Sequence, residues 1–379
     1  MTEAMPNVLA KIVAHKAGEV AALKAAKPLT TFITQVKPTE RDFLAALQQP
    51  GPRFILECKK ASPSKGLIRS DFNLAELAQV YGQYADCISV LTDETFFQGK
   101  YEYLRAMREL VDKPLLHKDF IIDSYQIYLG RHCGADAVLL MLSVLDDNEY
   151  RQLAATAAEL NMTVLTEVSN AAETARAVAL NAELIGINNR DLRDLSTNLN
   201  TSFELAKLIP EGRTVVSESG IYTNQQVRHL AQVADAFLVG SSLMAQADLA
   251  DATRKLVLGE HKVCGLTRPE DAAAAFAGGA YYGGLIFYPS SPRNVTPEQA
   301  AAVQQAAPLN YVGVFVNAGA AQVAELAHKL ALSAVQLHGD EDDSYISALK
   351  PLLPANCQVW KAYRVKDTLP EFTPLADCI

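Results

Sequence analysis

Residues 54–66 read Phe54-Ile-Leu-Glu-Cys-Lys-Lys-Ala-Ser-Pro-Ser-Lys-Gly66, an apolar run that passes into a polar loop containing glycine. The apolar part predicts a buried strand, and because strand side chains alternate between faces, Glu57 and Lys59 share one face. A carboxylate and an ammonium on a buried face are costly unless they pair or have a function. The hydroxyls, the cation and the flexible turn that follow are typical of an anion site. A structural ion pair followed by an ordinary turn is the alternative, and this stretch alone leaves both open.

Similar apolar, β-branched runs recur along the chain, each followed by a helical pattern, which predicts βαβ units and a parallel sheet. Eight such units within about 200 residues favour a closed (β/α)8 TIM barrel, an α/β fold. A doubly wound sheet is the alternative, disfavoured because no G-x-G-x-x-G follows the first strand. The expected strands span 54–58, 88–91, 115–117, 137–142, 163–167, 184–188, 214–217 and 236–239, and the expected helices span 74–84, 101–110, 124–133, 147–160, 171–180, 202–208, 225–232 and 249–256.

Two further helices are expected ahead of the first strand, over 8–26 and 40–47, which gives a helical extension over residues 1–52. The strand–helix pattern ends near Leu258 and restarts, so we expect two domains, 1–258 and 259–379. A TIM barrel needs eight strands, so the second domain is expected to be an incomplete (β/α) barrel. Its five expected strands span 261–265, 283–287, 311–316, 334–337 and 358–362, and a sixth is expected to begin at 377–379.

The composition is that of a globular protein: of 379 residues, 49% are hydrophobic and 20% are charged, and the formal net charge is −9. This acidic balance, without a Lys/Arg run, disfavours nucleic acid as a partner. Six cysteines without C-x-x-C spacing indicate reduced thiols and a cytoplasmic protein. We expect no secretory leader and no membrane association, because the sequence has neither a leader pattern nor a long apolar run. The full-length protein is expected to be a monomer.

Polar side chains follow six of the eight expected barrel strands, at the end where a TIM barrel carries its active site. A single such residue is usually part of a local pair, but six strands ending in this way indicate a site. The residues are Glu57 and Lys59 for the first strand, Lys118 for the third, Glu167 for the fifth, Asn188 for the sixth, Glu218 and Ser219 for the seventh, and Gly240 and Ser241 for the eighth.

The loops after the seventh and eighth strands predict a phosphate site, because Gly220 and Gly240 let backbone N–H groups approach an anion. Ser241 and Ser62 can add hydroxyl donors. Burial and mutual repulsion are expected to lower the pKa of the site lysines, which would let them act as acids near neutral pH. The histidines show no metal-ligand spacing. The residues therefore predict acid–base chemistry without cofactor or metal on a small phosphorylated substrate.

Six motifs, all in order between about residues 6 and 258, resemble indole-3-glycerol phosphate synthase, a family that carries a helical segment ahead of its barrel. The combination is specific to that family among phosphate-binding barrels. The motifs are Glu57-Cys-Lys-Lys-Ala-Ser-Pro-Ser, Ser89-Val-Leu-Thr-Asp-Glu94, Lys118-Asp-Phe120, Gly186-Ile-Asn-Asn-Arg-Asp-Leu192, Glu218-Ser-Gly220 and Gly240-Ser-Ser-Leu-Met244.

The resemblance implies a lyase of tryptophan biosynthesis. It closes the ring of 1-(2-carboxyphenylamino)-1-deoxyribulose 5-phosphate on the ketone, with loss of CO2 and water. Lys118 corresponds to the general acid for the ketone oxygen, and Glu167 to the acid–base group of dehydration. Lys59 corresponds to the contact of the substrate carboxylate and to a second acid, and which lysine performs which transfer stays open. The other implied roles are orientation and hydroxyl contacts for Glu57 and Asn188, wall residues for Glu218 and Ser219, and ring contacts for Phe120 and Leu139. Arg190 is expected to be a substrate-binding residue that supports the carboxylates and is not itself a catalyst.

The second domain resembles phosphoribosylanthranilate isomerase, so the whole chain resembles the bifunctional fusion with the synthase first. Cys264 corresponds to the base of an Amadori rearrangement, and Arg293 lies in a substrate-binding loop of that family. Without the motif, Cys264 would be interpreted as a small buried hydrophobic residue. The motifs are Lys262-Val-Cys-Gly-Leu-Thr267, Gly284-Leu-Ile-Phe-Tyr-Pro-Ser-Ser-Pro-Arg293, Gly313-Val-Phe-Val-Asn317 and Val335-Gln-Leu-His-Gly339.

Three functional questions stay open at this point. The isomerase family's catalytic aspartate follows its sixth strand, and its phosphate loops come later still. We therefore expect the 379-residue polypeptide to lack isomerase turnover, although the full-length protein is expected to have both activities. A non-catalytic phosphate-binding barrel and a different sugar-phosphate isomerase are the alternatives to the synthase. The paired acids and bases argue against a pure binding protein, which does not need them.

Overall fold

The computed structural model describes residues 8–191 and 195–379, so residues 1–7 of the expected extension and Leu192 of the sixth-strand motif lie outside the described residues. The chain divides into two compact units, Met1–Val257 and Leu258–Ile379. In the described ranges, no helix combines the length and the apolar character that crossing a membrane requires.

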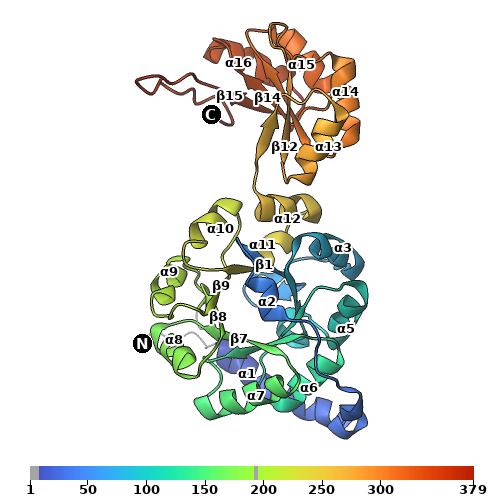
Figure 1. Cartoon of the computed structure of the whole chain (residues 1–379), viewed down its shortest axis with the longest axis vertical. Helices are drawn as coiled ribbons and strands as arrows, with labels where there is room; N and C mark the ends of the chain where they lie inside the picture. The colour runs from blue at the N-terminus through green and yellow to red at the C-terminus, as the bar shows by residue number, and fades with distance from the viewer. Residues whose placement is uncertain (1–7, 192–194) are drawn as a thin grey trace. The chain divides into compact units, whose positions relative to one another are not determined.

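Unit 1 is a closed barrel of parallel strands, as the strand–helix alternation predicts (Figure 1). The first strand hydrogen-bonds to the last and to the second barrel strand, with Phe54 beside Phe237 and Glu57 beside Ser89, so the barrel has no open edge. Each expected strand agrees with the structure to within one residue at either end. The strands are β1 (Arg53–Cys58), β4 (Cys87–Leu91), β5 (Leu115–Lys118), β6 (Ala137–Met141), β7 (Thr163–Val168), β8 (Leu184–Asn188), β9 (Thr214–Glu218) and β10 (Ala236–Val239).

Helices follow the strands and surround the barrel, so that the strand ends are free to carry a site (Figure 1). The expected helices agree with the structure to within two residues at either end. They are α3 (Leu74–Tyr84), α5 (Tyr101–Leu110), α6 (Ser124–His132), α7 (Asp147–Glu159), α8 (Ala171–Ala179), α9 (Asn200–Ala206), α10 (Asn224–Leu230) and α12 (Leu249–Leu258).

Two apolar cores flank the barrel wall, because alternate side chains of each strand point to opposite faces. Leu56 and Cys58 of β1 pack outward among the helices, whereas Ile55 packs inward with residues such as Leu165. Cys58 is therefore core-packed on the face opposite to Glu57.

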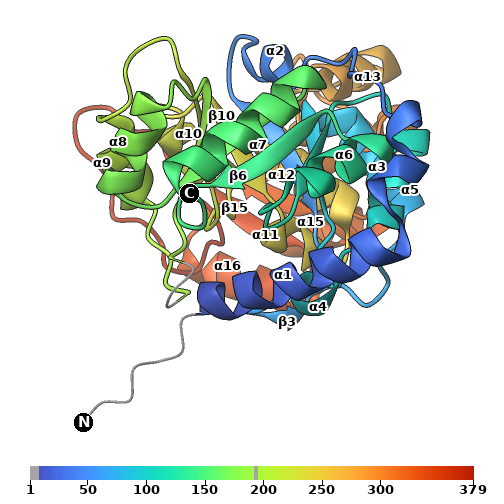
Figure 2. The ribbon, with the colours of Figure 1, turned by 90° about the horizontal axis from the view of Figure 1, so that it is seen from below.

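The N-terminal extension reaches both ends of the barrel through α1 (Val8–Ala26), the 3-10 turns η1 (Leu29–Thr31) and η2 (Ile33–Gln35), and α2 (Phe43–Leu47). Phe43 and Leu47 pack with Cys87, the first residue of β4, and so cover the amino ends of the strands. Helix α2 begins later than the expected residue 40, because Asp42 is its N-cap and accepts a hydrogen bond from the Ala45 N–H at 2.8 Å. Helix α1 lies beside the short helix α4 (Glu94–Phe97), where His15 and Thr95 are hydrogen-bonded (Figure 2).

The loop after β1 contains a small antiparallel hairpin that the sequence pattern does not predict. Its strands, β2 (Ala61–Ser62) and β3 (Gly66–Leu67), are too short to show a period. A second short element, α11 (Ser241–Met244), follows β10. Both elements lie directly after barrel strands and shape the loops expected to bind the substrate.

Unit 2 is a five-stranded parallel sheet in the order β11-β12-β13-β14-β15, open at both edges in the described part of the chain. The expected sixth strand is reduced to a single parallel bridge between Cys378 and Trp360. The strands are β11 (Lys262–Cys264), β12 (Tyr282–Ile286), β13 (Asn310–Phe315), β14 (Ala334–Leu337) and β15 (Gln358–Lys361), and the helices are α13 (Pro269–Ala277), α14 (Pro297–Ala306), α15 (Ala320–Lys329), α16 (Asp343–Leu349) and the 3-10 turn η3 (Lys350–Leu352).

Candidate active site

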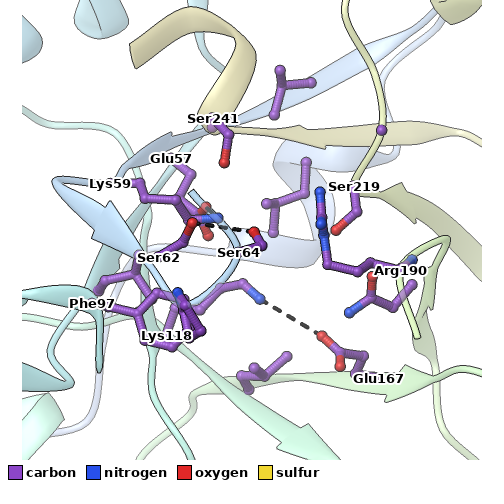
Figure 3. A pocket seen from close by; sticks show the side chains of 18 of the residues that line it. Glu57, Lys59, Ser62, Ser64, Phe97, Lys118, Glu167, Arg190, Ser219 and Ser241 are labelled. Carbon is purple, nitrogen blue, oxygen red and sulfur yellow. Dashed lines mark hydrogen bonds and ion pairs between the residues drawn. The ribbon is translucent and has the colours of Figure 1, made fainter. Parts of the chain in front are cut away.

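A cavity lies at the carboxyl ends of the barrel strands, and its lining contains most of the residues predicted from the sequence (Figure 3). Glu218 is buried and does not line the cavity, but it contacts the lining residue Lys118. Cys264 and Arg293 belong to unit 2 and are outside this cavity. The predicted residues that line it are Glu57, Lys59, Ser62, Lys118, Phe120, Leu139, Glu167, Asn188, Arg190, Ser219, Gly220, Gly240 and Ser241.

Lys118 occupies the centre of the charged part of the cavity. Its Nζ lies 3.4 Å from Glu218 Oε2 and 3.6 Å from Glu167 Oε2. Burial disfavours the ammonium, but the carboxylates of Glu218, Glu167 and Glu57 outweigh burial and raise the pKa of Lys118 above its ordinary value. The expectation of a lowered pKa is therefore wrong for Lys118, because three carboxylates from separate strands surround it.

Glu218 is the carboxylate whose titration the site changes most clearly. Burial raises its pKa to about 7, and the neighbouring Lys118 only partly opposes that effect. The carboxylate packs against Gly186 of the next strand, where any side chain would collide with it. A side chain at that position would therefore have to displace the Glu218 carboxylate.

Glu57 and Lys59 form the ion pair that strand periodicity predicts, with Nζ 2.5 Å from Oε1. Burial disfavours the Glu57 carboxylate, but Lys59 and Lys118 outweigh it and hold its pKa below the usual range. A side chain at Gly240 would come into close contact with this carboxylate. Gly240 therefore makes room for Glu57, in addition to any approach of its backbone to an anion.

The loop after β9 has an unusual backbone that turns it towards the cavity. Ser219 has a φ of 69°, in the left-handed region that residues other than glycine seldom adopt, and Gly220 follows with a φ of 78°. The Asn189 side chain donates to the Ser219 carbonyl at 3.1 Å and stabilises this conformation. Hydroxyl groups surround the same end of the cavity, from Ser62, Ser64, Ser219 and Ser241 (Figure 3).

Asn188 and Arg190 come from the end of β8. The Asn188 side chain accepts a hydrogen bond from the Arg190 N–H at 3.0 Å, and the Arg190 guanidinium donates to the Leu195 carbonyl at 3.2 Å. Both side chains line the cavity. Arg190 is thus placed where it can contact a ligand directly.

The apolar wall of the cavity includes residues that the sequence analysis did not assign to the site. Val8 and Ile12 of α1 and Phe97 of α4 line it together with the predicted Phe120 and Leu139. Phe97 follows the Ser89–Glu94 motif by three positions, which is the signal that could have identified it. The apolar face of α1 predicts packing, but it does not identify the surface against which the helix packs.

In unit 2, the structure brings the two predicted residues together. The Arg293 guanidinium donates to the Cys264 carbonyl at 3.0 Å. Lys262 Nζ lies 3.4 Å from Cys264 Sγ and 2.6 Å from Gln336 Oε1. The Cys264 side chain is exposed, unlike that of a small buried hydrophobic residue.

Comparison with known proteins identifies the family of each unit. Residues 9–256 match the family described as indole-3-glycerol phosphate synthase, and residues 261–377 match N-(5'-phosphoribosyl)anthranilate (PRA) isomerase. The tryptophan biosynthesis protein TrpCF of Vibrio cholerae is 58% identical over 98% of this chain and 80% of its own length. TrpCF of Salmonella typhi is 57% identical over 97% of this chain and 81% of its own, and that of Haemophilus influenzae is 50% identical over 95% and 77%. The chain therefore belongs to the TrpCF family, with an indole-3-glycerol phosphate synthase segment followed by a PRA isomerase segment.

Proposed function

We propose that the barrel of unit 1 converts 1-(2-carboxyphenylamino)-1-deoxyribulose 5-phosphate into indole-3-glycerol phosphate. The observation that carries this proposal is the Lys118 ammonium held between Glu167 and Glu218 inside the cavity. One side of that cavity is apolar and suits an aromatic ring, and the other side has glycine and serine loops that suit a phosphate. A cavity with acid, base, ring wall and phosphate loops has the groups that this reaction requires.

The charges in the cavity support the following sequence of steps. The ring carbon that bears the carboxylate bonds to the ketone carbon, while Lys118 donates a proton to the ketone oxygen and stabilises its developing charge. The carbon–carboxylate bond then breaks, its electron pair restores the aromatic ring, and CO2 leaves. The new hydroxyl leaves as water and the adjacent CH2 group loses a proton, with Glu167 as the acid–base group. Lys59, paired with Glu57, is the contact for the substrate carboxylate.

The phosphate end rests on Gly220, Gly240 and Ser241, which lie after the last two barrel strands. A small phosphorylated compound is therefore the expected partner of this site. A cytoplasmic location and a monomeric full-length protein stay predictions that fit such a metabolic enzyme.

The test is incubation of the purified chain with the carboxyphenylamino substrate while indole fluorescence is recorded. We expect fluorescence to rise, and we expect inorganic phosphate to compete with the substrate. A folded chain that binds phosphate without forming an indole would instead be a binding protein. A chain that isomerises another sugar phosphate would support the other alternative.

We propose a second activity, PRA isomerisation, for the fold of unit 2. The contact between Arg293 and Cys264 supports this proposal. Cys264 would act as the base of the Amadori rearrangement once the sheet is completed to a closed barrel. Because the sheet is open at β11 and β15, we expect no turnover of phosphoribosylanthranilate by the 379-residue polypeptide. Turnover that is lost in Cys264→Ala would show that the described strands already supply the acid and the phosphate ligands.

A further inference from the structure

A buried lysine that the proposed reaction does not use lies behind the apolar wall. The Lys16 side chain on α1 is 1% exposed, and its Nζ lies 2.8 Å from Asp93 Oδ2, 2.9 Å from Asp119 Oδ1 and 2.9 Å from Glu19 Oε2. An ammonium has three N–H donors, and three carboxylates surround this one. A buried ion cluster of this kind is costly to form, so its arrangement calls for an explanation.

One of the carboxylates connects Lys16 to α4. Asp93 follows β4 and is the N-cap of α4, where Oδ1 accepts hydrogen bonds from the Phe96 N–H at 2.7 Å and the Phe97 N–H at 3.2 Å. The position of the Phe97 ring in the cavity wall therefore depends on the Asp93 side chain that contacts Lys16.

A second carboxylate connects Lys16 to the end of β5. Asp119 follows Lys118 directly, and its Oδ1 accepts a hydrogen bond from the Phe120 N–H at 2.7 Å. On α1 itself, Ile12 lies one turn before Lys16, on the same face of the helix. The three segments that supply Ile12, Phe97 and Phe120 to the wall thus meet at a single ammonium.

We propose that Lys16 is a positioning residue that fixes the aryl wall, defined as Val8, Ile12, Phe97 and Phe120, and thereby sets affinity for the planar aromatic half of the substrate. The inference rests on the proposed synthase function. Its alternative is an ion cluster that only holds α1 to the barrel. The two differ in which part of the substrate loses affinity when Lys16 is replaced.

The test compares the full chain with its Lys16→Met variant, using anthranilate as a probe of the ring site and inorganic phosphate as a probe of the phosphate site. We expect the anthranilate Kd and the substrate KM to rise by about tenfold or more, the scale of lost fit in an apolar pocket. The inhibition constant of phosphate is expected to stay within about twofold, because Gly220, Gly240 and Ser241 follow β9 and β10, whereas the carboxylates that contact Lys16 belong to α1 and to the segments after β4 and β5. Turnover at saturating substrate should fall less than KM rises.

Glu19→Gln is the matched control, because Glu19 contacts the same ammonium from α1 itself and forms an ion pair with no other segment among the described residues. It should leave the anthranilate Kd unchanged. If Lys16→Met does not fold, Asp93→Asn is the second variant. It removes the negative charge that contacts Lys16 while keeping a side-chain oxygen for the α4 cap, and it should weaken anthranilate binding in the same way. Unchanged anthranilate affinity in a folded variant would overturn the inference, and so would an equal loss of affinity for inorganic phosphate. An unmodified chain that binds neither probe and forms no indole would overturn the proposed function instead.

Discussion

Lys118 is held in its ammonium form by three carboxylates, so a proton is in place for the ketone oxygen before the substrate arrives. Lys118→Ala should lower kcat for indole formation by about a hundredfold to ten-thousandfold, the usual contribution of a general acid. Indole fluorescence measures the rate, and thermal unfolding checks that the variant is folded. Lys207→Ala, at an exposed lysine, is the control and should be as active as the unmodified chain. Activity of Lys118→Ala within a few-fold of that control would refute the assigned role.

Glu218 should make stability depend on pH between the acidic and neutral range. Its pKa is raised from an ordinary value of 4.5 to about 7, so the folded chain binds this proton more tightly than the unfolded chain. The contribution of this proton to the free energy of unfolding is complete below pH 4.5. It is lost as pH rises through about 7, at up to about 1.4 kcal/mol for each pH unit. Glu218→Gln cannot titrate, so its unfolding free energy should fall less between about pH 5 and pH 8. Urea unfolding at both pH values measures this, and equal losses in both proteins would contradict the pKa shift.

At the level of residues, the sequence predicted which side chains meet but not how they titrate. Glu57 and Lys59 form a pair because the period of one strand places them on one face. The pKa of Lys118 depends on carboxylates of β1, β7 and β9, which lie far apart in the sequence. Its direction therefore needs the closed barrel, and the sequence-based expectation was wrong.

At the level of elements, Asp136 links several segments at the amino end of β6, away from the cavity. It is fully buried and accepts hydrogen bonds from Thr39, from the guanidiniums of Arg108 and Arg131 at 3.0 Å each, and from the Leu115 N–H at 2.9 Å. Contacts at the amino ends of the barrel strands contribute to stability and not to catalysis, because the active site of such a barrel lies at the carboxyl ends.

Asp136→Ala should accordingly lower the unfolding free energy by about 3–5 kcal/mol, the cost of leaving buried charged partners unpaired. Its kcat at a temperature where the variant is folded should be unchanged. Asp112→Ala removes a fully exposed carboxylate that pairs with Arg41, and its effect should lie within measurement error. Denaturant titration compares the two, and similar midpoints would mean that the Asp136 contacts contribute little.

The elements themselves were largely predictable, because each apolar run is long enough to show its period. The exceptions have local causes. Asp42 caps α2 and delays its start, and the hairpin β2–β3 is too short to carry a pattern. The part that Ile12 and Phe97 play in the cavity was not predictable, because helix amphipathicity indicates a buried face without naming its partner.

At the level of the whole molecule, each unit has its own hydrophobic core, which indicates that unit 1 can fold alone. A polypeptide of residues 1–258 should keep synthase kcat/KM within about twofold of the full chain. A shorter one that stops at Asp248 lacks α12, whose Leu249 and Leu256 are buried in the outer core of the barrel, and should not fold. Circular dichroism and the indole assay distinguish them. Loss of activity in the longer polypeptide would show that the synthase depends on unit 2.

The three carboxylates around Lys118 also disfavour one kind of chemistry in this barrel, the formation of an imine with the substrate ketone. A lysine beside a sugar-phosphate ketone can attack the carbonyl as a nucleophile and form an imine, which requires a free amine lone pair. Because Glu57, Glu167 and Glu218 keep the Lys118 amine protonated, that lone pair is occupied by the proton itself. The same side chain that would start aldolase chemistry in neutral form is thereby limited to giving protons, and the reactive ketone is spared covalent capture by its own enzyme.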